Sequence, residues 1–70
     1  MSMNGFKPGE KVAWDTSQGE TEGTVVRKLT EETHIKGHTA KATPEDPQYL
    51  VRSEKSGAEA AHRPEELRRR

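Results

Sequence analysis

The sequence contains no cysteine and few large apolar residues. Without cysteine, neither a disulfide framework nor a thiolate metal site stabilises the fold. Leu, Ile, Val and Phe together number nine of 70 residues, below the ~20% at which disorder becomes a serious alternative. Twelve basic residues balance twelve acidic ones, however, so the high net charge of disordered chains is absent. The apolar residues are also clustered, and we expect one small folded domain.

No apolar run is long enough for a signal peptide or a membrane-spanning helix. We therefore expect a cytoplasmic protein without membrane contact, and a monomer by default. Residues 1–35 carry four basic and six acidic side chains, whereas residues 36–70 carry eight and six. Three of these eight are the terminal arginines, which we interpret as a basic tail at 68–70. This is not the strongly basic composition of a dedicated nucleic-acid binder.

Short alternating segments separated by turn residues predict an all-β fold. The segments that have strand character are 11–15, 23–29, 34–36 with a continuation at 38–42, 48–53 and 58–62. We expect Thr16–Glu22 to be a polar connection. The strand at 23–29 has no cleanly apolar face, which predicts a bend that begins at Gly23 and carries the strand from one side of a barrel to the other.

These strands are short enough for a small SH3-like barrel. Pro64 predicts one short helical turn at 63–67, because proline is accepted at a helix start. We therefore predict an SH3-like barrel of four to five short strands over residues 6–67. A disordered N-terminus at 1–5 precedes it and the basic tail follows it.

Several stretches also resemble the hypervirulence-associated Tudor-domain family. They are KVAW (11–14), GTVV (23–26), IKGHT (35–39), DPQYLV (46–51) and, within 55–64, KSG followed by AAHRP. The resemblance spans about residues 6–67 and implies a Tudor-like barrel, but no catalytic residue. Tudor domains often bind methylated Lys or Arg in a cage of aromatic rings. With only Phe6, Trp14 and Tyr49 to serve both core and cage, the fold is carried over without that ligand.

Trp14 and Tyr49 have two interpretations. Either ring is a stacking surface for a base, a nucleotide or a peptide side chain, or it packs in a core that has little other apolar area. Core packing is favoured for Trp14, and the two interpretations are balanced for Tyr49, whose hydroxyl prefers a wet edge. Both residues are kept as candidate ligand-binding residues.

Four basic residues are the other candidates for ligand binding: Arg27, Lys36, Lys41 and Arg52. On one face of the barrel they would hold phosphates in a salt-sensitive way. The alternative is a solvated face whose charge is balanced by nearby acidic residues.

No catalytic residue, metal site or cofactor is predicted, because no positioned nucleophile–base pair, phosphate loop or metal-ligand spacing is present.

A chain of this size also leaves little room for a pocket of ~300 Å³. The sequence therefore predicts a non-catalytic binding module that recognises a protein segment, with an extended peptide lying on an open barrel edge. Nucleic-acid or nucleotide binding is the alternative, with stacking by Trp14 or Tyr49 and phosphate contacts from the basic residues.

Overall fold

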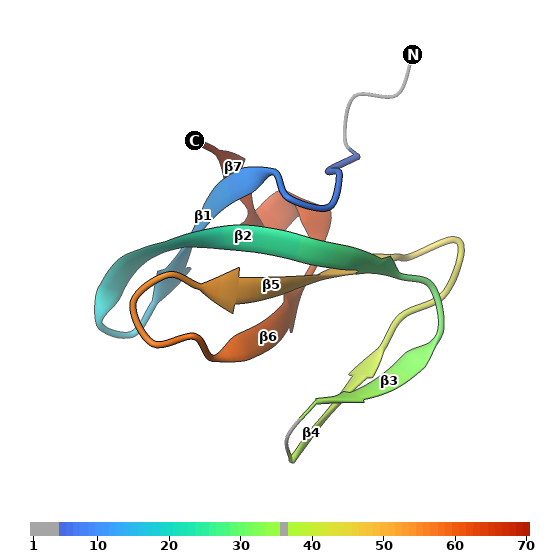
Figure 1. Cartoon of the computed structure of the whole chain (residues 1–70). Helices are drawn as coiled ribbons and strands as arrows, with labels where there is room; N and C mark the ends of the chain where they lie inside the picture. The colour runs from blue at the N-terminus through green and yellow to red at the C-terminus, as the bar shows by residue number, and fades with distance from the viewer. Residues whose placement is uncertain (1–4, 36) are drawn as a thin grey trace.

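Strands make up most of the chain, and the structure, a computed structural model, describes residues 5–35 and 37–70. The elements within these ranges are β1 (Lys11–Thr16), β2 (Gly19–Leu29), β3 (Glu32–Ile35), β4 (His38–Lys41), β5 (Gln48–Ser53), β6 (Glu59–His62), the 3-10 turn η1 (Pro64–Glu66) and β7 (Arg68–Arg69). Five strands form an antiparallel sheet in the order β6-β5-β2-β1-β7, and β3 and β4 form a separate hairpin (Figure 1). The predicted all-β barrel fold is confirmed, and η1 lies within the predicted helical turn.

Two small clusters of apolar side chains lie on opposite faces of β5, which lies between β6 and β2 in the sheet. Core 1 consists of Val12, Trp14, Val25, Tyr49, Val51 and Leu67, with Phe6 packed against it. Core 2 consists of Leu29, Ile35, Ala40, Ala42 and Leu50, with Ala61 packed against it. Tyr49 and Val51 face one cluster and Leu50 the other, because successive side chains of a strand point to opposite faces. The β3–β4 hairpin contributes Ile35 and Ala40 and so covers the second face.

A β-bulge at Val26 allows β2 to contribute to both cores. Val25 pairs with Val51, but the next pair is Arg27 with Leu50, so Val26 is an extra residue that has no partner on β5. In a regular strand Val25 and Leu29 would share a face, since they are four residues apart. The bulge turns Val25 into core 1 and Leu29 into core 2. The predicted crossing of this strand is therefore present, but the bulge at Val26 causes it rather than Gly23.

The predicted polar connection at Thr16–Glu22 is instead the tip of a hairpin and the first part of β2. Thr16 pairs with Gly19 across a two-residue turn, and Gly19 has a φ of 112°. The Thr16 hydroxyl donates to the Gly19 carbonyl at 2.8 Å and accepts from the Gln18 amide at 3.1 Å. Hydrophobic alternation missed this segment because Glu20 and Glu22 are exposed and form ion pairs rather than packing in a core.

At Gly23 the neighbouring strands leave no room for a side chain. A Cβ atom added there would overlap the Arg52 carbonyl oxygen and lie 2.6 Å from Cη2 of Trp14. Real Cβ atoms do not show such contacts, and backbone cannot move away as a flexible side chain can. Glycine at this position therefore allows the Trp14 ring to lie across β2.

The C-terminal arginines are paired rather than free. The structure differs here from the predicted tail at 68–70, because Arg68 pairs with Ala13 and Arg69 with Val12 in the short strand β7. Leu67, which precedes β7, is buried in core 1 and holds this end of the chain against the barrel. Since η1 connects β6 to β7, this pairing brings the two ends of the five-stranded sheet together.

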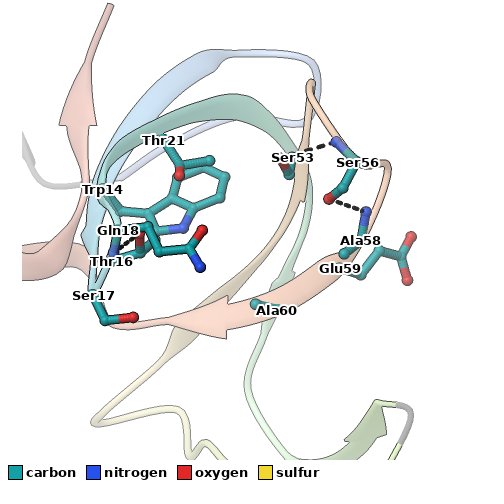
Figure 2. Close-up of a pocket in the computed structure, with 10 residues that line it drawn as sticks. All are labelled: Trp14, Thr16, Ser17, Gln18, Thr21, Ser53, Ser56, Ala58, Glu59 and Ala60. Atoms are coloured by element: carbon teal, nitrogen blue, oxygen red, sulfur yellow. Dashed lines mark hydrogen bonds between the residues drawn. The ribbon is translucent and has the colours of Figure 1, made fainter.

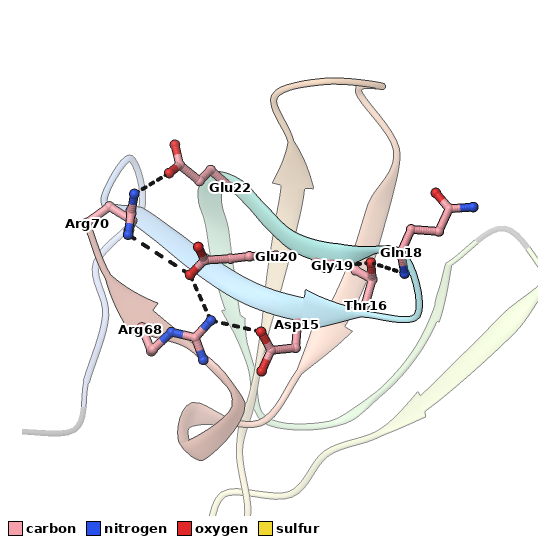
Figure 3. Close-up of polar contacts among 8 residues, drawn as sticks. All are labelled: Asp15, Thr16, Gln18, Gly19, Glu20, Glu22, Arg68 and Arg70. Carbon is pink, nitrogen blue, oxygen red and sulfur yellow. Dashed lines mark hydrogen bonds and ion pairs between the residues drawn. The ribbon is translucent and has the colours of Figure 1, made fainter.

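Acidic side chains on β1 and β2 complement these arginines. Arg68 binds Asp15 at 3.0 Å and Glu20 at 2.8 Å, and Arg70 binds Glu22 (Figure 3). Hydrogen bonds from Glu20 and Asp15 raise the pKa of the Arg68 guanidinium. Exposed pairs of this kind contribute little to stability, because water screens them. Their main effect is therefore to set the register of a two-residue strand.

We expect Gly23→Ala to lower the free energy of unfolding by about 3 kcal/mol, because the new methyl group overpacks a site bounded by backbone. Urea denaturation followed by Trp14 fluorescence measures the change. Gly5→Ala is the matched control, since its added Cβ would meet only the Tyr49 hydroxyl at 3.8 Å. Equal unfolding midpoints for the two variants would show that Gly23 does not limit the packing of Trp14.

Candidate functional site

The space between the C-terminal half of β1 and the strand β6 is hollowed on two sides of Trp14. We call this space the seam. One hollow, the hydroxyl hollow, has a volume of about 310 Å³ and is drawn in Figure 2. The other, the carboxylate hollow, has a volume of about 240 Å³ and is lined by Trp14, Asp15, His62 and Glu66. The sequence argument that the barrel leaves little room for a pocket of ~300 Å³ is wrong for the first hollow.

Trp14 is a core residue with one polar group, the indole N–H, that donates to no described residue. Its side chain belongs to core 1, and the residue is only 4% exposed. None of the hydrogen bonds among the described residues involves its indole N–H, and no fully buried polar atom there lacks a partner. Solvent therefore reaches that nitrogen. Figure 2 shows the nitrogen edge of the ring turned toward the side of Gln18, within the hydroxyl hollow.

The edge of β6 that faces away from β5 carries unpaired backbone groups. The Ser53 amide donates to the Ala58 carbonyl at 2.9 Å, which fixes the phase of the ladder. Bonded and non-bonded pairs alternate in an antiparallel ladder, so Ala60 and His62 bond to β5. The N–H and C=O groups of Glu59 and Ala61 therefore point outward. Because β6 is the last strand of the sheet, no further strand takes up these groups within the described chain.

Short polar side chains surround the mouth of the hydroxyl hollow. Those that carry hydroxyl groups are Thr16, Ser17, Thr21, Ser53 and Ser56. The turn between β5 and β6 places Ser53 and Ser56 on one side, and the β1–β2 hairpin places the threonines and Ser17 on the other (Figure 2). Histidine is not among the lining residues, and the one carboxylate residue there, Glu59, is paired with Arg52 at 3.3 Å.

The carboxylate hollow contains a His–Glu pair at the end of the seam that η1 closes. The His62 ring lies 5.4 Å from the Trp14 ring, and its Nδ1 donates to Oε1 of Glu66 at 3.0 Å. This hydrogen bond, aided by one from the Arg63 amide, lowers the pKa of the Glu66 carboxyl. Asp15, across the hollow, is held by Arg68 at 3.0 Å. Both carboxylates are thus already partnered.

Of the two predicted aromatic site residues, only Trp14 borders the seam. Tyr49 is 2% exposed in core 1, where it meets the Phe6 ring edge-on at 5.4 Å between centroids. Neither of its ring faces is open to a ligand in this arrangement. The core interpretation therefore describes the packing of both rings, while the indole edge of Trp14 keeps access to solvent.

The predicted basic residues do not gather at the seam. Arg27 and Arg52 are exposed on β2 and β5, and Arg52 is paired with Glu59 at 3.3 Å. Lys41 lies on β4, in the separate hairpin. Lys36 lies outside the described residues. None of the three described residues borders either hollow.

Sequence reasoning missed the hydroxyl residues of the seam and the contact of His62 with Trp14; a hydrogen bond from His62 to the closing turn was expected, and it is present with Glu66. The sequence carried two signals for them. Serines lie close to Gly57 in the β5–β6 turn, and the short strand predicted at 58–62 is the last predicted strand of the barrel. Neither pattern indicates that these elements meet Trp14, which depends on how the sheet curls. Trp14 and His62 are 48 residues apart in the sequence, so no local pattern predicts their contact.

The sequence model of the family described as "Hypervirulence associated proteins TUDOR domain" matches residues 9–67. The chain belongs to this family. The suspected resemblance is thereby confirmed over most of its length. No curated protein and no solved structure is detectably similar to the chain. Membership in a Tudor-domain family indicates a small binding module, and Tudor-like domains of this size are typically non-catalytic.

In this Tudor domain the described aromatic rings do not form a cage. Phe6 and Tyr49 pack on each other, and the Arg69 guanidinium covers the Phe6 ring at 4.7 Å from its centroid. Trp14 lies apart from them in the seam, next to His62. A methylated cation would need several ring faces around it.

Among the described residues no cluster of three His, Cys, Asp or Glu residues is placed to hold a metal ion, and no helix is long and apolar enough to cross a membrane.

We expect Glu66→Gln to lower stability at neutral pH but not in acid. The lowered pKa means that the ionised carboxyl favours the folded state. This contribution is complete above the ordinary value of 4.5 and disappears as the pH falls through the lower, folded-state value. Urea midpoints of the wild type and the variant at pH 7 and in acid measure the difference. Glu65→Gln, in the same turn, is the control, and a midpoint difference for Glu66→Gln that does not change with pH would contradict the assignment.

Proposed function

We propose that the chain is a non-catalytic binding module that takes an extended protein segment along the outer edge of β6, beside Trp14. The observation that carries this proposal is the row of outward backbone groups of Glu59 and Ala61, next to a hollow into which Trp14 directs an unpaired donor. Addition of a strand to an exposed edge uses these backbone groups for affinity and nearby pockets for specificity.

The seam supplies what such a segment needs. Alternate side chains of a bound strand point to the same face, so one of them is directed toward the hollows and the next away from them. Glu59 and Ala61 provide both donors and acceptors, as an incoming antiparallel strand requires. Tudor-family membership supports a binding module in general, and the edge of β6 is the surface that we assign to the protein segment.

Nucleic-acid binding stays a prediction, because the described basic residues and Trp14 do not form a shared surface for it. Of its basic residues, Arg52 is paired with Glu59, and the candidate stacking ring Trp14 is bordered by the carboxylates of Asp15 and Glu66. A phosphate backbone close to Trp14 would meet these negative charges. Binding by an uncharged backbone edge is not opposed in this way.

Proline at position 59 tests the proposal, because it removes one outward N–H without removing a hydrogen bond to β5. Peptides selected from a random display library on the full chain serve as probes, and ¹H–¹⁵N spectra map their binding. We expect the largest shifts at Glu59 and Ala61. Glu59→Pro should weaken binding about tenfold. Glu59→Ala, which loses only the exposed pair with Arg52, should change it by about twofold or less.

A second measurement does not depend on the folding of a variant. Methylating the backbone nitrogens of a selected peptide one at a time should abolish binding at every second residue, since alternate N–H groups face β6. Equal tolerance at all positions, or shifts confined to the β3–β4 hairpin, would show that the segment does not add to this edge.

A further inference from the structure

The two end strands of the five-stranded sheet differ in how they are protected against pairing with another chain. β7 carries Arg68 and Arg69, both exposed, and charged side chains are a common means of keeping an edge strand from pairing. β6 has the sequence Glu-Ala-Ala-His, without lysine, arginine or proline, and it pairs with β5 in an unbroken register. Its carboxylate residue, Glu59, is held by Arg52 of the same copy at 3.3 Å. The edge of β6 is therefore the unprotected end of this sheet.

The backbone of β6 allows a symmetric pairing with a second copy. In an antiparallel pair, residues that direct their N–H and C=O groups toward the partner strand lie opposite each other. In β6 these residues are Glu59 and Ala61, which flank Ala60. A two-fold axis at Ala60 places Glu59 of each copy opposite Ala61 of the other. Every outward backbone group of both strands then has a partner.

The turns at the two ends of β6 exclude the neighbouring registers. A shift toward the β5–β6 turn would place Ala61 opposite Gly57, whose amide already donates to a carbonyl within that turn. A shift toward η1 would place Glu59 opposite Arg63. The amide and the carbonyl of Arg63 are both bonded to Glu66. The register on the two-fold axis is therefore the one that uses the free groups of β6 and no others.

Charge and side-chain size do not oppose this pairing. The chain has equal numbers of basic and acidic residues, so two copies do not repel each other through net charge at neutral pH. The Glu59 carboxylate faces the methyl group of Ala61 of the second copy rather than another carboxylate. On the axis, the Cα atoms of the two Ala60 residues would lie about 4.5 Å apart, a distance that two methyl groups accommodate.

We propose that β6 pairs with β6 of a second copy about a two-fold axis at Ala60, which joins the two five-stranded sheets into one continuous sheet. This inference goes beyond the proposed function and does not depend on it. The dimer and the bound segment use the same backbone groups, so they exclude each other, and a segment binds by replacing the second copy. So few backbone hydrogen bonds make a weak dimer, with a Kd of about 1 mM.

Single cysteines test the register, because the chain has no cysteine of its own. Ala60→Cys places two thiols opposite each other on the axis, where a disulfide can form. Ala58→Cys is the matched control: Ala58 lines the same hollow as Ala60, but its two copies would lie about 13 Å apart along the strands. In air oxidation of the full chain at about 1 mM, we expect Ala60→Cys to link about tenfold faster than Ala58→Cys. Equal rates, or faster linkage through residue 58, would overturn the pairing.

The wild-type chain gives a second measurement that needs no variant. Between about 0.02 and about 2 mM, the amide resonances of Glu59 and Ala61 should shift with concentration, and the mass in sedimentation equilibrium should rise toward that of a dimer. A monomer mass with constant resonances throughout this range would overturn the dimer. Shifts confined to the β3–β4 hairpin or to β7 would also overturn it, since another edge would then associate.

The two proposals fail separately. A chain that stays monomeric while selected peptides shift Glu59 and Ala61 would contradict the dimer and support segment binding. A dimer linked through Ala60→Cys, in a chain to which no selected peptide binds, would support the pairing and contradict the proposed function. Where both hold, an added peptide should lower the mass toward that of the monomer.

Discussion

The packing of Trp14 across Gly23 is the constraint on which the rest of this structure depends. The chain has one tryptophan, and its ring packs in core 1 and borders both hollows of the seam. That position is possible only because Gly23 presents no Cβ to the ring. The faces of the ring pack in core 1, and its nitrogen edge stays at the surface. Stability and the candidate site therefore use different parts of one side chain.

The C-terminal arginines hold β7 against β1, the strand that forms one wall of the seam. β7 is two residues long, and no apolar side chain of its own holds it to β1. Burial of Leu67 anchors it, at about 1.5–3 kcal/mol for a side chain of this type, and the ion pairs with Asp15 and Glu20 determine its register. The same ion pairs use the carboxylates that would otherwise make the face of β1 strongly acidic.

Local patterns predicted the strands that contact a core and missed those that do not. Val12 and Trp14, or Tyr49 and Val51, alternate as half-buried strands do, and the family motifs cover the same residues. Glu20 and Glu22 lie in an equally regular strand, but they pair with arginines nearly 50 residues away, which no local pattern records. For the same reason Arg68–Arg70 resembled a tail. Of the candidate site, Trp14 was predicted, but its approach to His62 depends on the curl of the sheet.

A scarcity of aromatic residues has a consequence for how such a domain can bind. Recognition through ring faces requires rings that the core can spare, and here Phe6 and Tyr49 are occupied with each other. Backbone edges and short hydroxyl side chains cost the core nothing, because they carry no apolar area that folding needs to bury. A small barrel with little apolar surface therefore keeps its rings inside, and under the proposed function it binds through a strand edge. The ring of Trp14 is buried in the core, and its N–H is a polar group at the surface. Among the described residues, this side chain therefore serves both the core and the candidate site.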